Sequence, residues 1–172
     1  MADHGDGSMS KPTHITLRLL GPFAIEANVG RPILIAVRSR KARALLAYLA
    51  MQRDYRGTRE ELATLLWGNG PDQQARHSLR QCVIALRQDL GLASEILALD
   101  REAIWLRAQS VSVDAHSFIA FARSAEPDAL TRATALWRGA FLSDLTLDIE
   151  EFGSWQRREA DRLAAAAGDV FG

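Results

Sequence analysis

The sequence predicts an α+β fold in which a β-sheet precedes three helices and a β-hairpin, and a short all-α segment of helical hairpins follows. Three observations predict it. Short apolar segments punctuated by Gly and Pro occupy residues 15–37. The apolar spacing then changes to i, i+3, i+4, i+7, which is typical of amphipathic helices. Two more short apolar segments flank Asp100-Arg101 before helical spacing resumes.

Length and composition limit the class of protein. The chain has 172 residues, 48% of them hydrophobic, which predicts one domain or two small ones with a real core. The longest apolar run, Ala44–Met51, is far shorter than a membrane span, and the first residues lack a signal peptide's apolar stretch. A lone Cys82 excludes internal disulfides and a Cys-based zinc site. These features predict a soluble, cytoplasmic protein with no membrane partner.

Charge is distributed unevenly although Lys+Arg and Asp+Glu both number 21. Residues 11–91 contain 13 basic and 6 acidic side chains, whereas residues 108–172 contain 6 basic and 10 acidic ones. This asymmetry is typical of an anion-binding module joined to an interaction module. Ordinary surface variation is the alternative explanation.

The first third of the chain is predicted to be a leader followed by strands. Residues 1–13 are small, polar and rich in Gly and Asp, and they predict a disordered leader. Three strands are predicted after it, at Ile15–Leu20, Phe23–Val29 and Arg31–Val37, with Gly and Pro between them.

Three helices are predicted next, and each has a recognisable boundary. Ser39 caps the first, whose apolar residues recur with helical spacing from Ala42. Thr58 and Glu61 form a capping box that starts the second. The third runs from about Asp72 to Leu90 and stops at Gly91.

The third helix has one apolar side and one polar side. At 100° per residue its apolar side chains fall near one line, namely Ala75, Leu79, Cys82, Val83, Leu86 and Leu90. The opposite side carries Gln74, His77, Gln81 and Gln88, and Arg76, Arg80 and Arg87 flank them. The apolar line predicts a core contact, and the polar side is offered to solvent or to a ligand.

Residues 96–107 are predicted to form a hairpin around Asp100-Arg101. Helices follow from Val113-Asp114, from Pro127-Asp128 and over Glu150–Ala167. Two helices, a turn, a polar-faced third helix and a hairpin together predict a winged helix-turn-helix.

Several fragments resemble one protein family in the same order. They are LRLLGPFAIEANVGRP, RKARALLAYLA, TREELATLLWGNG and ARHSLRQCVIALRQDLG. The segment from Leu17 to Leu106 resembles the OmpR/PhoB-type winged helix of the SARP group of bacterial transcriptional activators. Residues VDAHSFIAFA, ALTRATALWRGAFL and FGSWQRREADRL are similar to the start of the activator domain of that group, a stack of tetratricopeptide-like hairpins. The resemblance implies a winged-helix DNA-binding domain over residues 14–108 and a partial activator-type helical domain over residues 112–172. One departure is that Ala103-Ile104 replaces the Gly-Tyr usual in the wing.

The candidate site is a DNA interface on the third helix and the hairpin. Its predicted residues are Arg76, His77, Arg80, Gln81, Arg87 and Arg101. Arg, Gln and His side chains can bind base edges in the major groove, and flanking Arg side chains can neutralise phosphates. The resemblance implies that His77 and Gln81 face the groove. A solvated helix face and a solubilising turn residue at Arg101 are the alternatives.

The sequence predicts a DNA-binding regulator and no enzyme. No phosphate-binding loop, catalytic motif or cluster with metal-ligand spacing occurs, so neither a metal nor another cofactor is expected. The resemblance implies an activator that binds tandem promoter-upstream repeats as two or more copies, which includes a homodimer on DNA. It also implies that the activator contacts RNA polymerase. The alternatives are a protein-interaction or scaffold module of a signalling protein, and the regulatory front end of a longer enzyme.

Overall fold

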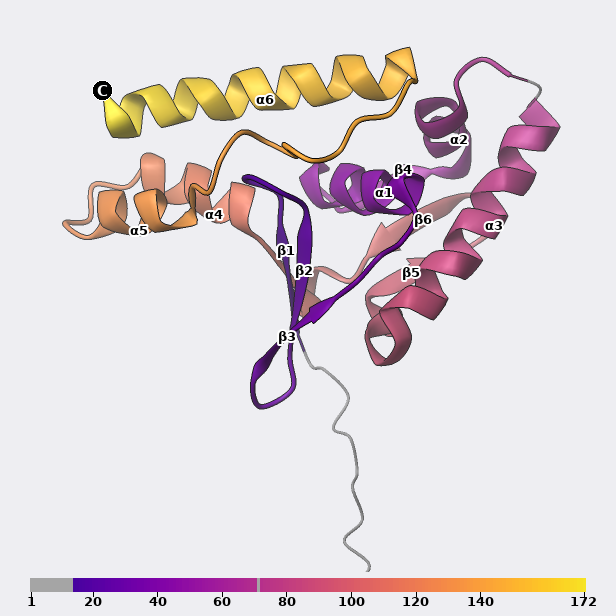
Figure 1. Ribbon diagram of the computed structural model, residues 1–172, viewed down its shortest axis with the longest axis horizontal. Helices are drawn as coiled ribbons and strands as arrows, with labels where there is room; N and C mark the ends of the chain where they lie inside the picture. Colours follow the sequence, from indigo (N-terminus) through magenta and orange to yellow (C-terminus); the bar gives the residue numbers. More distant parts are fainter. Residues whose placement is uncertain (1–13, 71) are drawn as a thin grey trace, which may run out of the picture.

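The computed structural model describes residues 14–70 and 72–172, which form two β-sheets and six α-helices (Figure 1). The predicted disordered leader, residues 1–13, and Pro71 lie outside the described residues. Along the long axis of the molecule, helix α3 lies at one end and helices α4 and α5 lie at the other.

The first sheet has four strands in the order β3-β2-β1-β7. Its members are β1 (Ile15–Arg18), β2 (Ala24–Asn28), β3 (Pro32–Ile35) and β7 (Val111–Val113). Strands β1, β2 and β3 are antiparallel and confirm the three predicted strands with shorter ends. Strand β1 ends early because the N–H groups of Leu19 and Leu20 donate to the carboxylate of Asp114, at 2.8 and 3.1 Å.

Three helices follow, as predicted: α1 (Arg40–Met51), α2 (Arg59–Trp67) and α3 (Asp72–Leu90). The Ser39 hydroxyl accepts a hydrogen bond from the Ala42 N–H and caps α1. Thr58 and Glu61 exchange side-chain and backbone hydrogen bonds at the start of α2, so the capping box is present. All six predicted core residues of α3 are buried, and the predicted amphipathic pattern is confirmed.

The second sheet forms the wing and has three strands in the order β4-β6-β5. Strands β5 (Leu97–Leu99) and β6 (Ala103–Leu106) are the predicted hairpin, and a 3-10 helix, η1 (Gly91–Ile96), connects α3 to it. Strand β4 (Arg56–Thr58) pairs with β6. Ala103 and Ile104, which replace the Gly-Tyr usual in the resembled family, are fully buried in β6.

The remaining residues form a helical tail. After a 3-10 turn, η2 (Ala108–Ser110), strand β7 pairs in parallel with β1 and leads into α4 (Asp114–Ala122), α5 (Ala129–Leu136) and α6 (Glu150–Phe171). Helix α6 extends four residues past the predicted end at Ala167 and lies across the top of the molecule in Figure 1. Trp155 of α6 contacts Tyr48 of α1, with ring centroids 5.2 Å apart.

One continuous group of buried side chains joins the sheet, the three helices, the wing and the tail. Phe118 and Phe152 of the tail are as completely buried as Leu45 and Leu66 of the helix-turn-helix. Within residues 14–70 and 72–172, no helix has the length and apolar character needed to cross a membrane.

Candidate nucleic-acid interface

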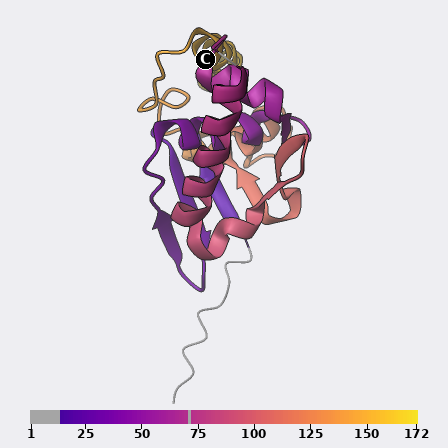
Figure 2. The same cartoon turned by 90° about the vertical axis from the view of Figure 1, so that its right-hand side faces the viewer.

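Helix α3 presents its polar side outward. Figure 2 shows α3 in front of the rest of the molecule along its length. Arg76, His77, Arg80 and Gln81 are all exposed. His77 and Gln81 lie on the side opposite the buried line that includes Leu79 and Cys82, and Arg76 and Arg80 flank that line. Ile84 on the same side is 51% exposed, and it gives this face an apolar position beside its hydrogen-bonding ones.

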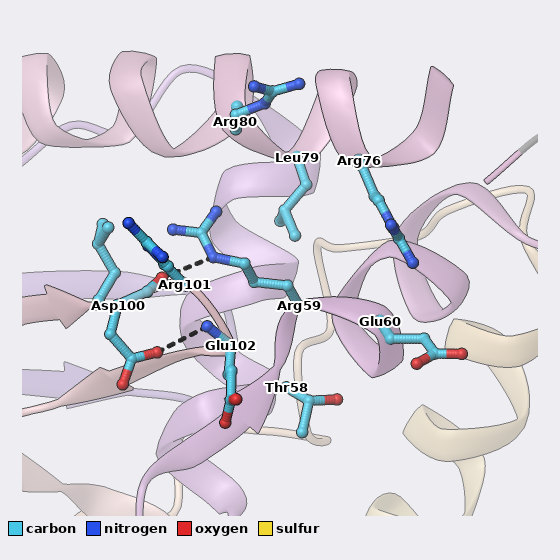
Figure 3. Close-up of a pocket in the computed structure, with 10 residues that line it drawn as sticks. Thr58, Arg59, Glu60, Arg76, Leu79, Arg80, Asp100, Arg101 and Glu102 are labelled. Atoms are coloured by element: carbon cyan, nitrogen blue, oxygen red, sulfur yellow. Dashed lines mark hydrogen bonds between the residues drawn. The ribbon is translucent and has the colours of Figure 1, made fainter. Parts of the chain in front are cut away.

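A groove of about 950 Å³ separates α3 from the tip of the wing. Four arginines line it and come from three elements: Arg59 from α2, Arg76 and Arg80 from α3, and Arg101 from the β5–β6 turn (Figure 3). The structure therefore brings together three of the predicted residues, Arg76, Arg80 and Arg101, with an arginine that the sequence analysis did not identify. Carboxylates of Glu60, Asp100 and Glu102 also line the groove.

The wing tip is a turn held by Asp100. The N–H groups of Glu102 and Ala103 both donate to its Oδ1, each at 2.8 Å. These bonds from Ala103 and Glu102 hold the pKa of Asp100 below its ordinary value. The Asp100 carboxylate is therefore bound within the turn, and the Arg101 side chain is exposed at the tip.

Arg59 fixes the wing tip to the start of α2. Its Nε donates to the Asp100 carbonyl at 2.8 Å, and its backbone N–H donates to the Glu102 carbonyl at 2.8 Å. The guanidinium therefore supports the turn and lines the groove at the same time. The sequence does not predict this contact, because Arg59 and Asp100 are far apart in the chain. The one signal that marks Arg59 is its position directly after Thr58 in the resembled motif.

Arg87 is placed differently from the other predicted residues. Its Nη2 donates to the Leu97 carbonyl of β5 at 3.0 Å. Arg107 at the base of the hairpin makes a similar bond, from Nε to the Glu95 carbonyl at 2.8 Å. Both side chains hold the connection between α3 and the wing, and neither lines the groove between them.

Three basic residues at the start of α1, Arg38, Lys41 and Arg43, are engaged within the protein. Arg38 forms an ion pair with Asp89, and Arg43 donates from Nε to the Val37 carbonyl. Lys41 lies over the Trp67 ring, with Nζ 4.6 Å from the centroid, and burial lowers the pKa of Lys41. These contacts hold the segment between β3 and α1 against α3, and they hold α1 against the end of α2.

Cys82 is the buried thiol in the core line of α3. Burial raises the pKa of the Cys82 thiol to about 11, so the thiol stays protonated and unreactive near neutral pH. Among the described residues, no three His, Cys, Asp or Glu side chains are placed to hold a metal ion. The site offers cations, amides and an imidazole on an exposed helix beside a basic groove.

A helix-turn-helix with an exposed polar third helix, a β-wing and an N-terminal sheet has the architecture of winged-helix transcriptional regulators. The structure is similar to Mycobacterium tuberculosis EmbR, solved in complex with a low-affinity phosphopeptide, with a TM-score of 0.65 and 25% sequence identity. The match covers 91% of this chain and 44% of the EmbR chain, so the chain spans less than half of that protein's length.

EmbR is a SARP-family, OmpR-like regulator, and its likeness confirms the predicted α+β fold with the SARP-type winged helix. The fold is therefore that of a SARP-type transcriptional regulator. No protein-family model and no curated protein matches the sequence.

Proposed function

We propose that the chain binds double-stranded DNA in a sequence-specific manner as a bacterial, cytoplasmic transcriptional regulator. Residues 14–108 form the DNA-binding part, and residues 112–172 are the start of a tetratricopeptide-like activator domain. The regulator activates transcription by binding promoter-upstream repeats as two or more copies and by contacting RNA polymerase. Helix α3 enters the major groove, and the wing approaches the neighbouring minor groove.

The groove lined by four arginines carries this proposal. Arg76 and Arg80 line this groove from α3, and Arg59 and Arg101 line it from α2 and from the wing tip. Arg76 points from α3 toward Glu60 at the start of α2 (Figure 3). Because a DNA strand presents a row of phosphates, one strand lying between α3 and the wing would meet cations on both sides. His77 and Gln81, one position further round the helix, are then exposed toward the base edges.

Phosphate contacts and base contacts predict different mutant behaviour. Arg76→Glu with Arg80→Glu removes two phosphate contacts, and it should lower affinity for all duplexes at least tenfold. It should also reduce the slope of log affinity against log salt by roughly 1.8. Gln81→Ala should instead cost about 1–3 kcal/mol at one base position and change the preferred sequence.

The measurement is fluorescence anisotropy at several salt concentrations, with duplexes selected from a random pool. Arg31→Glu with Arg123→Glu is the matched control, since it makes the same change in net charge outside the groove and should retain most of the affinity. Wild-type affinity and salt slope in the Arg76/Arg80 variant would refute the proposal.

A protein-interaction module is the second candidate function, and the carboxylates of Glu60, Asp100 and Glu102 in the groove favour it. The salt titration separates the two. A DNA-binding protein loses affinity for duplexes steeply with added salt, whereas an interaction module shows no specific duplex binding to titrate.

A further inference from the structure

A second groove, of about 790 Å³, lies between α2 and α6. We name it the α2–α6 groove. Its lining residues are Tyr48, Thr58, Glu60, Glu61, Thr64, Leu65, Glu150, Glu151, Ser154, Trp155 and Arg158. None of the predicted DNA-contacting residues belongs to it.

The lining residues recur along both helices at a spacing of one turn. On α2, Glu61 is followed four residues later by Leu65, and on α6, Glu151 is followed by Trp155. The groove therefore follows the two helices, with Tyr48 and the Trp155 ring as its aromatic base. A third helix with apolar side chains at i, i+3 and i+4 fits such a groove.

The rim of the groove is acidic. Four glutamates border it, against a single cation at Arg158. Glu61 is used by the capping box, and Glu150 binds Ser154 and Arg157. Within the described part of the chain, Glu60 and Glu151 have no hydrogen bond or ion pair.

The position of Glu151 is not explained by helix stability alone. First-turn carboxylates stabilise the start of their own helix, and Glu151 does so for α6. Its carboxylate also lies beside Gly68, the C-cap of α2, with Oε2 3.5 Å from the site where a Cβ would be. Negative charge at a helix C-terminus is unfavourable. A cation bound in the groove would compensate for that charge.

The α2–α6 groove also adjoins the arginine groove, because Thr58 and Glu60 line both. An occupant of the α2–α6 groove would therefore lie next to the DNA that the arginine groove is proposed to hold.

We propose that the α2–α6 groove binds a basic, amphipathic helix of a protein assembled on the same DNA. Leucine-like side chains of that helix pack on the half-buried Tyr48 and on the exposed edges of Leu65 and Trp155, which are 8% and 6% exposed. The lysines or arginines of the helix face Glu60 and Glu151. The proposal rests on the proposed function and deepens it, because it names a surface through which the regulator contacts RNA polymerase.

The test uses the whole chain and two synthetic helical peptides. One peptide has lysines on one face and leucines on the other, and the second has the same lysines with serines in place of the leucines. In NMR titrations the first peptide should shift the signals of Thr64, Leu65 and the Trp155 indole N–H. The second should bind at least tenfold more weakly.

Two single variants with the same change in net charge identify the site. Glu151→Lys should weaken binding of the leucine peptide at least tenfold, and Glu151→Gln should weaken it less. Asp161→Lys changes an exposed residue further along the same helix and should bind as the wild type does. The NMR spectrum of each variant reports whether it is folded.

Three outcomes overturn the proposal: equal binding of both peptides, shifts outside α2 and α6, or self-association without peptide, which would make a second copy the occupant. DNA affinity measured on the same variants distinguishes failure of the peptide-binding proposal from failure of the DNA-binding proposal. None of the substituted residues lines the arginine groove, so duplex binding should persist when peptide binding is lost.

Discussion

Asp89 supports the base of the interface through a single partner residue. Its carboxylate accepts hydrogen bonds from the Arg38 N–H at 3.0 Å and from Arg38 Nε at 2.9 Å. The first of these bonds is the main reason why the pKa of Asp89 lies below its ordinary value, and the guanidinium lowers it further. The carboxylate thereby ties the linker after β3 to the last turns of α3.

The lowered pKa predicts how this contact depends on pH. Its contribution to stability is complete above the unfolded-state pKa of 3.8, and it is lost as pH falls through the lower folded-state value. Asp89→Asn should therefore lower the free energy of unfolding by about 1 kcal/mol at pH 7, since Arg38 is largely exposed and the pair is screened.

Urea unfolding at pH 7 and at pH 3 measures both values, and the difference between wild type and variant should shrink at pH 3. Asp161→Asn removes an exposed carboxylate without such partners and is the control. A difference that grows on acidification would contradict this role for Asp89.

The sequence predicted single residues well where helical periodicity determines their environment. Cys82 was predicted in the core line of α3, and it is buried. Arg59 could not be predicted, because its contact with Asp100 joins residues 41 positions apart. Arg87 shows the same limit, since an arginine flanking a polar face can equally reach a neighbouring carbonyl. Its predicted DNA contact remains a prediction.

At the scale of elements, the helices were easier to predict than the strands. Helices α1, α2 and α3 carry their caps and apolar spacing within their own residues. Strands β4 and β7 were missed because each has only three residues and is defined by a partner far along the chain. Arg56–Thr58 contains a glycine and no alternation, so only its pairing with β6 makes it a strand.

Arg59 supports the wing tip with one side-chain hydrogen bond. Arg59→Ala removes the bond from Nε to the Asp100 carbonyl, and the backbone bond from Arg59 to Glu102 stays. A hydrogen bond of this kind contributes about 0.5–1.5 kcal/mol, so hydrogen exchange of the Glu102 and Ala103 amides should accelerate roughly threefold to tenfold.

Arg101→Ala is the control for Arg59→Ala, because it removes the same charge near the wing tip without removing a hydrogen bond that supports the turn. The Arg101 side chain is exposed at the tip and makes no hydrogen bond among the described residues, so exchange at Glu102 and Ala103 should remain at the wild-type rate. Unchanged exchange in Arg59→Ala would mean that the turn is held by Asp100 alone.

At the scale of the whole molecule, the tail and the winged helix share their interior. The buried Asp114 at the start of α4 binds the backbone of Leu19 and Leu20, and burial raises the pKa of this carboxyl. His116 of α4 stacks on Tyr55 beside β4, with ring centroids 5.8 Å apart. The predicted division between residues 14–108 and 112–172 therefore falls at a packed junction, and the assignment of two domains remains a prediction.

Shared packing leads us to expect one unfolding transition. Trp67 and Trp105 lie in the winged helix, and Trp137 and Trp155 lie in the tail. A variant with Trp67→Phe and Trp105→Phe reports the tail by fluorescence, whereas far-UV circular dichroism reports all helices. The two urea transitions should have the same midpoint, as in a two-state domain.

A fluorescence midpoint at lower urea than the circular dichroism midpoint would show that the tail unfolds first. The same experiment on Arg59→Ala in this background provides a comparison, because that change affects the wing and should leave the two midpoints coincident.

The parallel pairing of β1 with β7 has a consequence for how the protein is made. Strand β1 is synthesised before the other strands of its sheet, yet one of its two edges is completed only by Val111–Val113. Strands β1, β2 and β3 are therefore synthesised well before the fourth strand of the sheet can pair with them. By then the α3 face is already outside the exit tunnel, so the sheet that supports it matures together with the first turn of the tail.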